Sequence, residues 1–179
     1  MVTADVSARL AWPDDAGAIA RVQIAAWRDM YADVLAPEVL ESLDADDFAE
    51  RWTVSLTKPQ DARIRVLVAL DRADIRGFAL VHPSFDPDAD QVTDGEVGEL
   101  VIDPEHRGEG HGSRLLQAAM DTLAADHFTR VRWWIASTDD ALRDFVTSSG
   151  WEADGAHREL QDDAGNTIKQ VRLHTTPAA

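Results

Sequence analysis

The residues with the clearest chemical potential form a glycine-rich segment near the middle of the chain. An apolar run, Leu100-Val101-Ile102, is followed by glycines at the alternate positions Gly108, Gly110 and Gly112. Glycine permits positive φ angles and close approach of a ligand, and successive backbone N–H groups in such a turn converge on one anion. An amphipathic pattern from Leu115 to Leu123 then predicts a helix, whose first N–H groups also favour phosphate. The segment therefore predicts a strand, a turn and a helix that together bind an anion.

Three known anion-binding loops compete for this pattern. A Walker A loop requires a lysine after its last glycine, and no lysine follows Gly112. A dinucleotide fingerprint requires Gly-x-Gly-x-x-Gly, whereas the spacing here is Gly-x-Gly-x-Gly. The third pattern, Arg/Gln-x-x-Gly-x-Gly/Ala, is matched by Arg107, Gly110 and Gly112. The spacing therefore favours this third kind of loop.

Composition limits the possible partners of the protein. The 179 residues favour a single domain, and no apolar run reaches the length of about 18 residues that a membrane span needs. A net charge of −16 argues against nucleic acid and anionic membranes as partners. It would favour cationic partners such as amines, or else the acidic residues only solvate the surface. The chain has no cysteine, so a disulfide framework and a thiol nucleophile are excluded. The first residues, Met-Val-Thr-Ala-Asp-Val, lack the basic and apolar regions of a secretion signal, so we expect a cytoplasmic protein.

The periodicity of apolar residues predicts the elements that must position this segment. We expect strands over residues 6–12, 63–70, 75–81, 96–102, 130–136, 156–160 and 167–174. We expect helices after Pro13-Asp14-Asp15 up to Asp29, from Pro37, over 45–55, over 110–125 and over 141–149. The Asp- and Pro-rich residues 82–95 predict an exposed loop. This order predicts one α/β (α+β) domain over residues 1–179, a mixed sheet with helices on both faces, with a loose tail at 176–179.

The motifs and the order of elements resemble the GNAT superfamily of acyl-CoA-dependent N-acetyltransferases. The strongest motif runs from Val101 to Gly112: an apolar strand, Asp-Pro, then Arg-Gly-x-Gly-x-Gly. A second match runs from Ala141 to Trp151, with an aromatic residue after a glycine. The early aromatic residues Trp27 and Tyr31 are a third. The resemblance covers nearly the whole chain and implies a mostly antiparallel sheet that splays at a bulge in its central strand.

The resemblance also implies how an acyl donor binds. The backbone of Leu100 and Ile102, on either side of Val101, would pair with the pantetheine amides of acetyl-CoA like an added strand. The pyrophosphate would lie on the turn beside Arg107, against Gly108, Glu109, Gly110, His111, Gly112 and Ser113. An amine would then attack the thioester directly. No metal is implied.

Direct transfer requires a base, because the attacking amine must be uncharged. Glu99 and Glu96 are the candidates on the central strand, and we favour Glu99 because it adjoins the apolar run. Their spacing of three positions predicts that they point to opposite faces of a regular strand. His82 and His111 are further possibilities, although His111 also fits a place on the cofactor loop.

Two positions affect the predicted acceptor site and the protonation of the departing thiolate. The family often has a tyrosine acid after the phenylalanine of the second motif, but this chain has Val146 there. Tyr31 is the only tyrosine, so it is an alternative acid, as is water. Trp27 and Tyr31 share one helix face, where they would bind a cationic amine, or else Trp27 is a core residue. The acidic loop from Pro83 to Asp94 would flank that site, or else be mobile and take no part in it.

We therefore predict an N-acetyltransferase that moves an acetyl group from acetyl-CoA to a primary amine. A small-molecule acceptor is favoured over a peptide or protein amine, such as an N-terminus or a lysine. The missing acid leaves a second possibility, a weakly catalytic acyl-CoA-binding sensor or partner protein. Transfer of longer acyl groups, or transfer to hydroxyl groups, is a third. A homodimer is compatible with the sequence.

Overall fold

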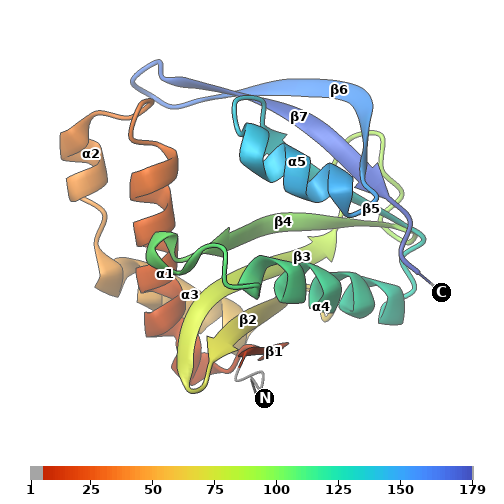
Figure 1. The fold of residues 1–179 in the computed structure, drawn as a ribbon, viewed down its shortest axis with the longest axis horizontal. Coiled ribbons are helices and arrows are strands. Elements are labelled where there is room, and N and C mark those ends of the chain that lie inside the picture. Colours follow the sequence, from red (N-terminus) through yellow and green to blue (C-terminus); the bar gives the residue numbers. More distant parts are fainter. Residues whose placement is uncertain (1–5, 179) are drawn as a thin grey trace.

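A computed structural model describes residues 6–178, which form seven strands and five α-helices (Figure 1). The strands are β1 (Val6–Leu10), β2 (Arg65–Asp71), β3 (Asp74–Pro83), β4 (Asp94–Ile102), β5 (Arg130–Ala136), β6 (Glu152–Gln161) and β7 (Thr167–Thr175). The helices are α1 (Ala16–Met30), α2 (Pro37–Glu41), α3 (Ala45–Thr57), α4 (His111–Ala125) and α5 (Asp140–Ser148), with short 3-10 turns at Pro13–Asp15 and Pro104–His106. None of these helices is long and apolar enough to cross a membrane.

The strands form one sheet in the order β1-β2-β3-β4-β5-β7-β6. Only β4 and β5 are parallel, and every other neighbouring pair is antiparallel. The predicted mixed and mostly antiparallel sheet is confirmed.

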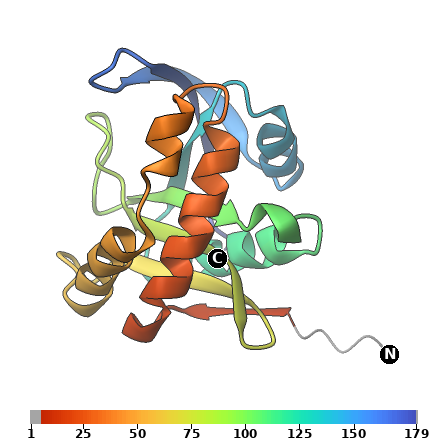
Figure 2. The ribbon, with the colours of Figure 1, turned by 90° about the vertical axis from the view of Figure 1, so that its left-hand side faces the viewer.

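Helices cover both faces of this sheet, and each face has its own core (Figure 2). On one face α1 and α3 bury residues such as Ile19 and Trp52 against β2 and β3. On the other face α4 and α5 bury Leu115, Leu123 and Val146 against β3, β4 and β5. We call these the α1 face and the α4 face.

The sheet opens at its centre, between β4 and β5. The two strands pair only over Asp94–Val97 and Arg130–Trp133, after which β4 keeps β3 as its only partner. The antiparallel register of β3 and β4 also shifts, because Leu80 pairs with Glu99 while Val81 pairs with Val97. Gly98 is therefore the extra residue of a β-bulge, which bends the strand that carries it. The sheet is splayed at the point where the predicted cofactor-binding run begins.

Local capping explains both ends of α5. The side chain of Asp139 accepts a hydrogen bond from the backbone of Leu142 and begins α5, and Gly150 ends it with a φ of 90°. β6 begins at Glu152, earlier than predicted, because an irregularity between Ala153 and His157 hides its alternation. Thr176–Ala178 lie outside regular elements, and Ala179 lies outside the described residues.

The prediction of an exposed loop over residues 82–95 is wrong in part. β3 continues to Pro83 and β4 starts at Asp94, which shortens the loop. Ser84 and Asp94 are buried at the two ends of the loop, with 0% and 2% of their surface exposed. The composition suggested that the loop carboxylates face solvent, but the side chains of Asp86 and Asp94 are buried and form ion pairs.

Candidate active site

Glu99 lies on the α1 face of β4 and is held by two side chains of α1. Nε1 of Trp27 donates to Oε1 at 2.8 Å, and Nε2 of Gln23 donates to Oε2 at 3.0 Å. Gln23 is itself oriented by Trp52, whose Nε1 donates to the amide oxygen at 2.8 Å. Since that oxygen is occupied, the amide nitrogen of Gln23 must face Glu99. The carboxylate is fixed at the splay by a chain of hydrogen bonds that crosses the α1 core.

The environment of Glu99 adjusts its proton affinity. Burial raises the pKa of this carboxyl group, and the hydrogen bonds from Trp27 and Gln23 oppose that rise without cancelling it. A carboxylate with a raised pKa binds a proton more strongly than one in water. This property suits a group that accepts protons.

Glu96 lies on the same face of β4 as Glu99, which corrects the prediction of opposite faces. Glu96 pairs with His82 and Glu99 with Leu80, two residues that are two positions apart on β3 and share a face. The bulge at Gly98 adds one residue to β4 and so reverses the alternation that a regular strand would have. Both carboxylates therefore face the region beside α1.

Glu96 has a second set of partners from the loop after β3. The hydroxyl of Ser84 donates to its Oε2 at 2.9 Å. Burial raises the pKa of Glu96, against the hydrogen bond from Ser84 and the charge of His82. Glu96, which is buried, and Glu99, which is partly buried, are thus two carboxyl groups with raised pKa values on one face of a single strand.

His82 is fixed above the bulge. Its Nδ1 lies 2.7 Å from the carbonyl oxygen of Pro83, so this nitrogen carries the donated proton, and its ring stacks on Phe85 at 5.1 Å. A Cβ atom at Gly98 would lie 2.5 Å from Nε2 of His82. Glycine at the bulge therefore makes room for the imidazole. His82, one of the alternative bases, stands close to Glu96 and apart from the hydrogen bonds of Glu99.

The two aromatic residues of α1 share one face, as predicted, but have different environments. The rings of Trp27 and Tyr31 meet edge to face at 6.0 Å, and Trp27 meets Phe48 in the same way at 5.4 Å. Burial, and then the charge of Glu99, raise the pKa of Tyr31, so its hydroxyl stays protonated at neutral pH. Trp27 is a hydrogen-bond donor to Glu99 as well as an aromatic surface.

The glycine turn has the conformation that its sequence predicts. Gly108 and Gly110 have φ angles of 78° and 88°, and a Cβ atom on either would meet nothing within 4 Å. Gly110 precedes the first turn of α4, where Ser113 is exposed. Open space above glycines with positive φ, next to a helix N-terminus, fits a phosphate group. Gly112 has ordinary contacts and no positive φ.

The charged residues of this turn lie mostly at its surface. NH1 of Arg107 pairs with Oδ2 of Asp29 at 2.7 Å, and both side chains are about half exposed. Glu109 is also about half exposed and lies 3.3 Å from Nε2 of His111. That distance suits an ion pair but lacks hydrogen-bond alignment, so both ring nitrogens of the buried His111 have no hydrogen-bond partner among residues 6–178. An exposed ion pair such as that of Arg107 contributes little to stability.

The apolar run before the turn divides its side chains between the two cores. Leu100 and Ile102 pack on the α4 face, and Val101 packs on the α1 face. The edge of this run that faces away from β3 has no strand partner in the described sheet. Unpaired backbone on a strand edge can hydrogen-bond an extended ligand.

Val146 occupies the position where the family often has a tyrosine. Its side chain is fully buried in the α4 core, so no proton donor is present there. Phe145 lies closer to the turn, with its ring 3.9 Å from where a Gly112 Cβ would be.

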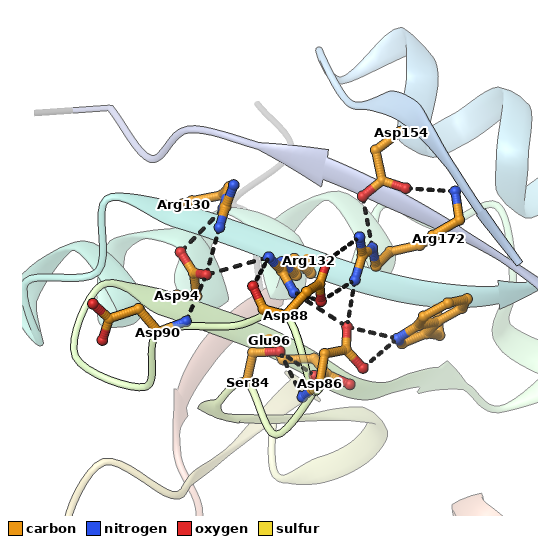
Figure 3. Close-up of polar contacts among 12 residues, drawn as sticks. Ser84, Asp86, Asp88, Asp90, Asp94, Glu96, Arg130, Arg132, Asp154 and Arg172 are labelled. Carbon is orange, nitrogen blue, oxygen red and sulfur yellow. Dashed lines mark hydrogen bonds and ion pairs between the residues drawn. The ribbon is translucent and has the colours of Figure 1, made fainter. Parts of the chain in front are cut away.

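The acidic loop between β3 and β4 contacts β5 and β7, the strands across the splay from β3 and β4 (Figure 3). Asp86 accepts from Nε1 of Trp134 at 3.0 Å and from NH1 of Arg172 at 3.0 Å. Asp88 accepts from Arg132 at 2.7 Å and from Arg172 at 2.8 Å. The loop therefore joins β5 and β7 through buried guanidinium groups, and its contacts flank Glu96.

Sequence reasoning missed several residues of this site. Gln23, Ser84, Asp86 and Arg172 were not candidates, although a glutamine among the apolar residues of α1 was a visible signal. The spacing of Gln23, Trp27 and Tyr31, four residues apart in each case, places them in one row on the helix. Asp86 and Arg172 had no comparable signal, because Asp86 finds its partners Trp134 and Arg172 more than 40 positions away along the chain.

The sheet is splayed, a glycine turn precedes a helix, and a partly buried carboxylate lies at the opening. These features together define a class of acyltransferase folds. The acetyltransferase (GNAT) family model matches residues 24–151, and the chain belongs to this family. An uncharacterized N-acetyltransferase of Bacillus subtilis (strain 168), YuaI, is 26% identical over 171 residues, which cover 94% of this chain and 91% of that protein. The predicted family and acyltransferase class are confirmed.

Solved structures agree on the fold. The PaiA N-acetyltransferase of Thermoplasma acidophilum, in complex with coenzyme A, matches with a TM-score of 0.71 at 16% identity over 96% of this chain and 98% of that one. The putative acetyltransferase yncA of Salmonella typhimurium, with acetyl-CoA, matches with a TM-score of 0.70 at 18% identity over 97% of this chain and 95% of that one. Both likenesses concern the architecture rather than the site residues.

Proposed function

We propose that this protein transfers an acetyl group from acetyl-CoA directly to the primary amine of a small molecule, with Glu99 as general base. The observation that carries the proposal is the partly buried Glu99 carboxylate, held by Trp27 and Gln23 where β4 parts from β5. The two neighbours that hold coenzyme A and acetyl-CoA support the choice of donor. The net charge of −16 is compatible with attraction of a cationic amine.

The residues of the glycine turn fit this donor. Gly108 and Gly110, with positive φ and open space above them, would hold its pyrophosphate with the N-terminus of α4, and Arg107 would stand beside it. The free edge of β4 at Leu100–Ile102 would hold its amides. When bound, acetyl-CoA supplies an acetyl group activated as a thioester.

The carboxyl groups of the α1 face would handle the protons. An amine arrives mostly as its ammonium form, and Glu99 would take the proton directly or through water, because burial has raised its proton affinity. Glu96 lies on the same face and offers a second acceptor. Tyr31 keeps its hydroxyl proton at neutral pH and is the candidate donor from protein, since the usual position is the buried Val146.

The test is free-thiol release from acetyl-CoA across a panel of amines, for the wild type and Glu99→Gln. We expect turnover by the wild type that falls as pH drops through the pKa of Glu99, because the base must be ionised. In Glu99→Gln we expect turnover to fall about 100-fold and this acid limb to disappear. An unchanged pH profile in Glu99→Gln would remove Glu99 as base.

The panel also separates the second candidate function, an acyl-CoA-binding protein with little catalysis, which the buried Val146 favours. Acetyl-CoA binding measured by calorimetry, without thiol release from any amine, would support that role. Turnover of acetyl-CoA compared with that of longer acyl-CoAs tests the transfer of longer acyl groups. Turnover with amines compared with that of hydroxyl acceptors tests transfer to hydroxyl groups.

A further inference from the structure

Arg158 lies across the splay from Glu99. It lies on β6, and its guanidinium carbon is 4.3 Å from the ring centroid of Trp134 on β5. Its Nε donates to Oε1 of Gln170 on β7 at 2.7 Å. The side chain thus reaches across β7 to the indole and is held by a stack and a hydrogen bond. Those contacts fix the plane of the guanidinium and leave its two terminal NH2 groups without a hydrogen-bond or ion-pair partner among residues 6–178.

The neighbouring arginines show what is different about Arg158. Arg132 and Arg172 come from the same part of the sheet, and each pairs with both Asp86 and Asp88. In the part of the chain from 6 to 178, no carboxylate lies within ion-pair distance of Arg158. The sequence has 33 acidic residues and 17 lysines and arginines, so carboxylates are abundant. A fixed guanidinium without a carboxylate partner is available to bind the anionic group of a ligand.

Arg158 lies on the face of the sheet where Glu96 and Glu99 lie. Trp134, which it covers, donates to Asp86, and Asp86 belongs to the loop that carries Ser84, the hydrogen-bond donor to Glu96. The positive charge of Arg158 lowers the pKa of Glu96, although burial raises that pKa by more. The opening between β4 and β5 therefore has a carboxyl group on one side and a free guanidinium on the other.

We propose that Arg158 binds a carboxylate of the acceptor, so that the substrates are amines that carry a carboxylate, as amino acids do. This inference rests on the proposed acetyl transfer and names its substrate class. A guanidinium stacked on an indole presents a planar pair of donors, the geometry that matches a carboxylate. Arg172 also lies over Trp134 but is already paired with Asp86 and Asp88, so the unpaired charge of Arg158 suits a group of charge −1 better than a phosphate dianion.

The experiment compares matched acceptors that differ only in this group, namely α-amino acids and their carboxamides. Steady-state kinetics with acetyl-CoA are measured for the wild type, Arg158→Gln and Arg158→Lys. We expect the wild type to prefer the amino acids, and Arg158→Gln to raise KM for them about 10- to 100-fold while leaving the carboxamides unchanged, as loss of a hydrogen bond to a charged group predicts. Arg158→Lys should recover only part of the loss, because the ammonium lacks the planar pair of donors.

Arg51→Gln is the control for loss of one positive charge, because Arg51 is exposed on α3 and has no carboxylate partner among the described residues. It should leave both acceptor classes unchanged, and circular dichroism with Tm should show that each variant is folded. Equal use of acids and carboxamides by the wild type, or an equal effect of Arg158→Gln on both, would overturn the role of Arg158. Turnover of simple amines alone would leave acetyl transfer standing and reject only the carboxylate. If wild-type protein acetylated no amine at all, the proposed function itself would fail, and this inference with it.

Discussion

At the scale of single residues, Glu99 depends on two side chains that hold it. Trp27 and Gln23 each donate one hydrogen bond to its carboxylate, and Trp52 keeps the amide of Gln23 in the required orientation. These donors favour the ionised form, whereas burial favours the protonated form. The proton affinity of the proposed base is therefore a balance that single substitutions can shift.

Trp27→Phe should move the acid limb of the pH–rate profile to higher pH. The ring remains, but one hydrogen bond to the carboxylate is lost, so the pKa of Glu99 rises further and the base is ionised only at higher pH. Loss of a hydrogen bond to a charged group predicts a shift of about 1 pH unit. The measurement is kcat against pH at saturating acetyl-CoA.

Trp12→Phe is the matched control, because Trp12 is 60% exposed and lies at the start of the chain beside Arg9. Its profile should coincide with that of the wild type. If Trp27→Phe lowered kcat at every pH without moving the limb, Trp27 would be a substrate contact and not a residue that positions Glu99.

At the scale of elements, the bulge in β4 decides which side chains meet. Gly98 is the additional residue of the bulge, and it brings Glu96 and Glu99 to one face. It also lies under His82, whose Nε2 a Cβ would approach to 2.5 Å. The imidazole is held by Pro83 and Phe85, so it has little freedom to move away.

Gly98→Ala should therefore destabilise the protein by about 1–3 kcal/mol, as overpacking does. The combination His82→Ala with Gly98→Ala should recover part of that loss, because removing the ring provides the space. Chemical denaturation of the wild type, both single variants and the double variant gives the coupling energy. Additive losses would show that the clash with His82 is not the reason for glycine at this position.

At the scale of the whole molecule, ion pairs of two buried arginines join the two halves of the splayed sheet. The loop after β3 carries Asp86 and Asp88, and these bind Arg132 on β5 and Arg172 on β7 (Figure 3). β4 and β5 share only four paired positions, so these contacts supply a second connection. Carboxylates of this loop thus form ion pairs within the protein and do not only interact with solvent.

Arg172→Gln should cost about 3 kcal/mol of unfolding free energy, because it leaves the buried Asp86 and two further carboxylates with fewer partners. Arg143→Gln, which breaks the exposed pair with Asp140, should change stability by less than about 1 kcal/mol. Denaturant titration measures both. Equal effects would contradict the structural role of Arg172.

The ion pair of Arg172 with Asp88 predicts that the stability of the protein falls as the pH falls. Hydrogen bonds from Arg172 hold the pKa of Asp88 below its ordinary value. That contribution to stability is present above the unfolded pKa of about 3.9 and is lost as pH falls through the lower folded pKa. The difference in stability between the wild type and Arg172→Gln should therefore narrow below about pH 4.

The glycine turn and most elements were predictable because their causes are local. Positive φ at Gly108 and Gly110 requires glycine wherever the turn occurs, and β5 was predicted over exactly the residues 130–136 that it occupies. The Asp139 cap and Gly150 marked both ends of α5 in the same way. The family followed from these local patterns in their order along the chain.

The arrangement of the site was decided by the tertiary structure. The common face of Glu96 and Glu99 depends on the register of β4 against β3, which the spacing of the two residues alone cannot reveal. The pairing of Asp86 and Asp88 with Arg172, and the freedom of Arg158 from any such pair within residues 6–178, depend on strands that are distant in sequence and adjacent in the sheet. The sequence by itself determined the anion-binding turn, the order of elements and the acyltransferase family, because φ requirements and apolar periodicity act over a few residues. Strand register and long-range charge pairing then determined which carboxylates meet, and those are properties of the folded sheet.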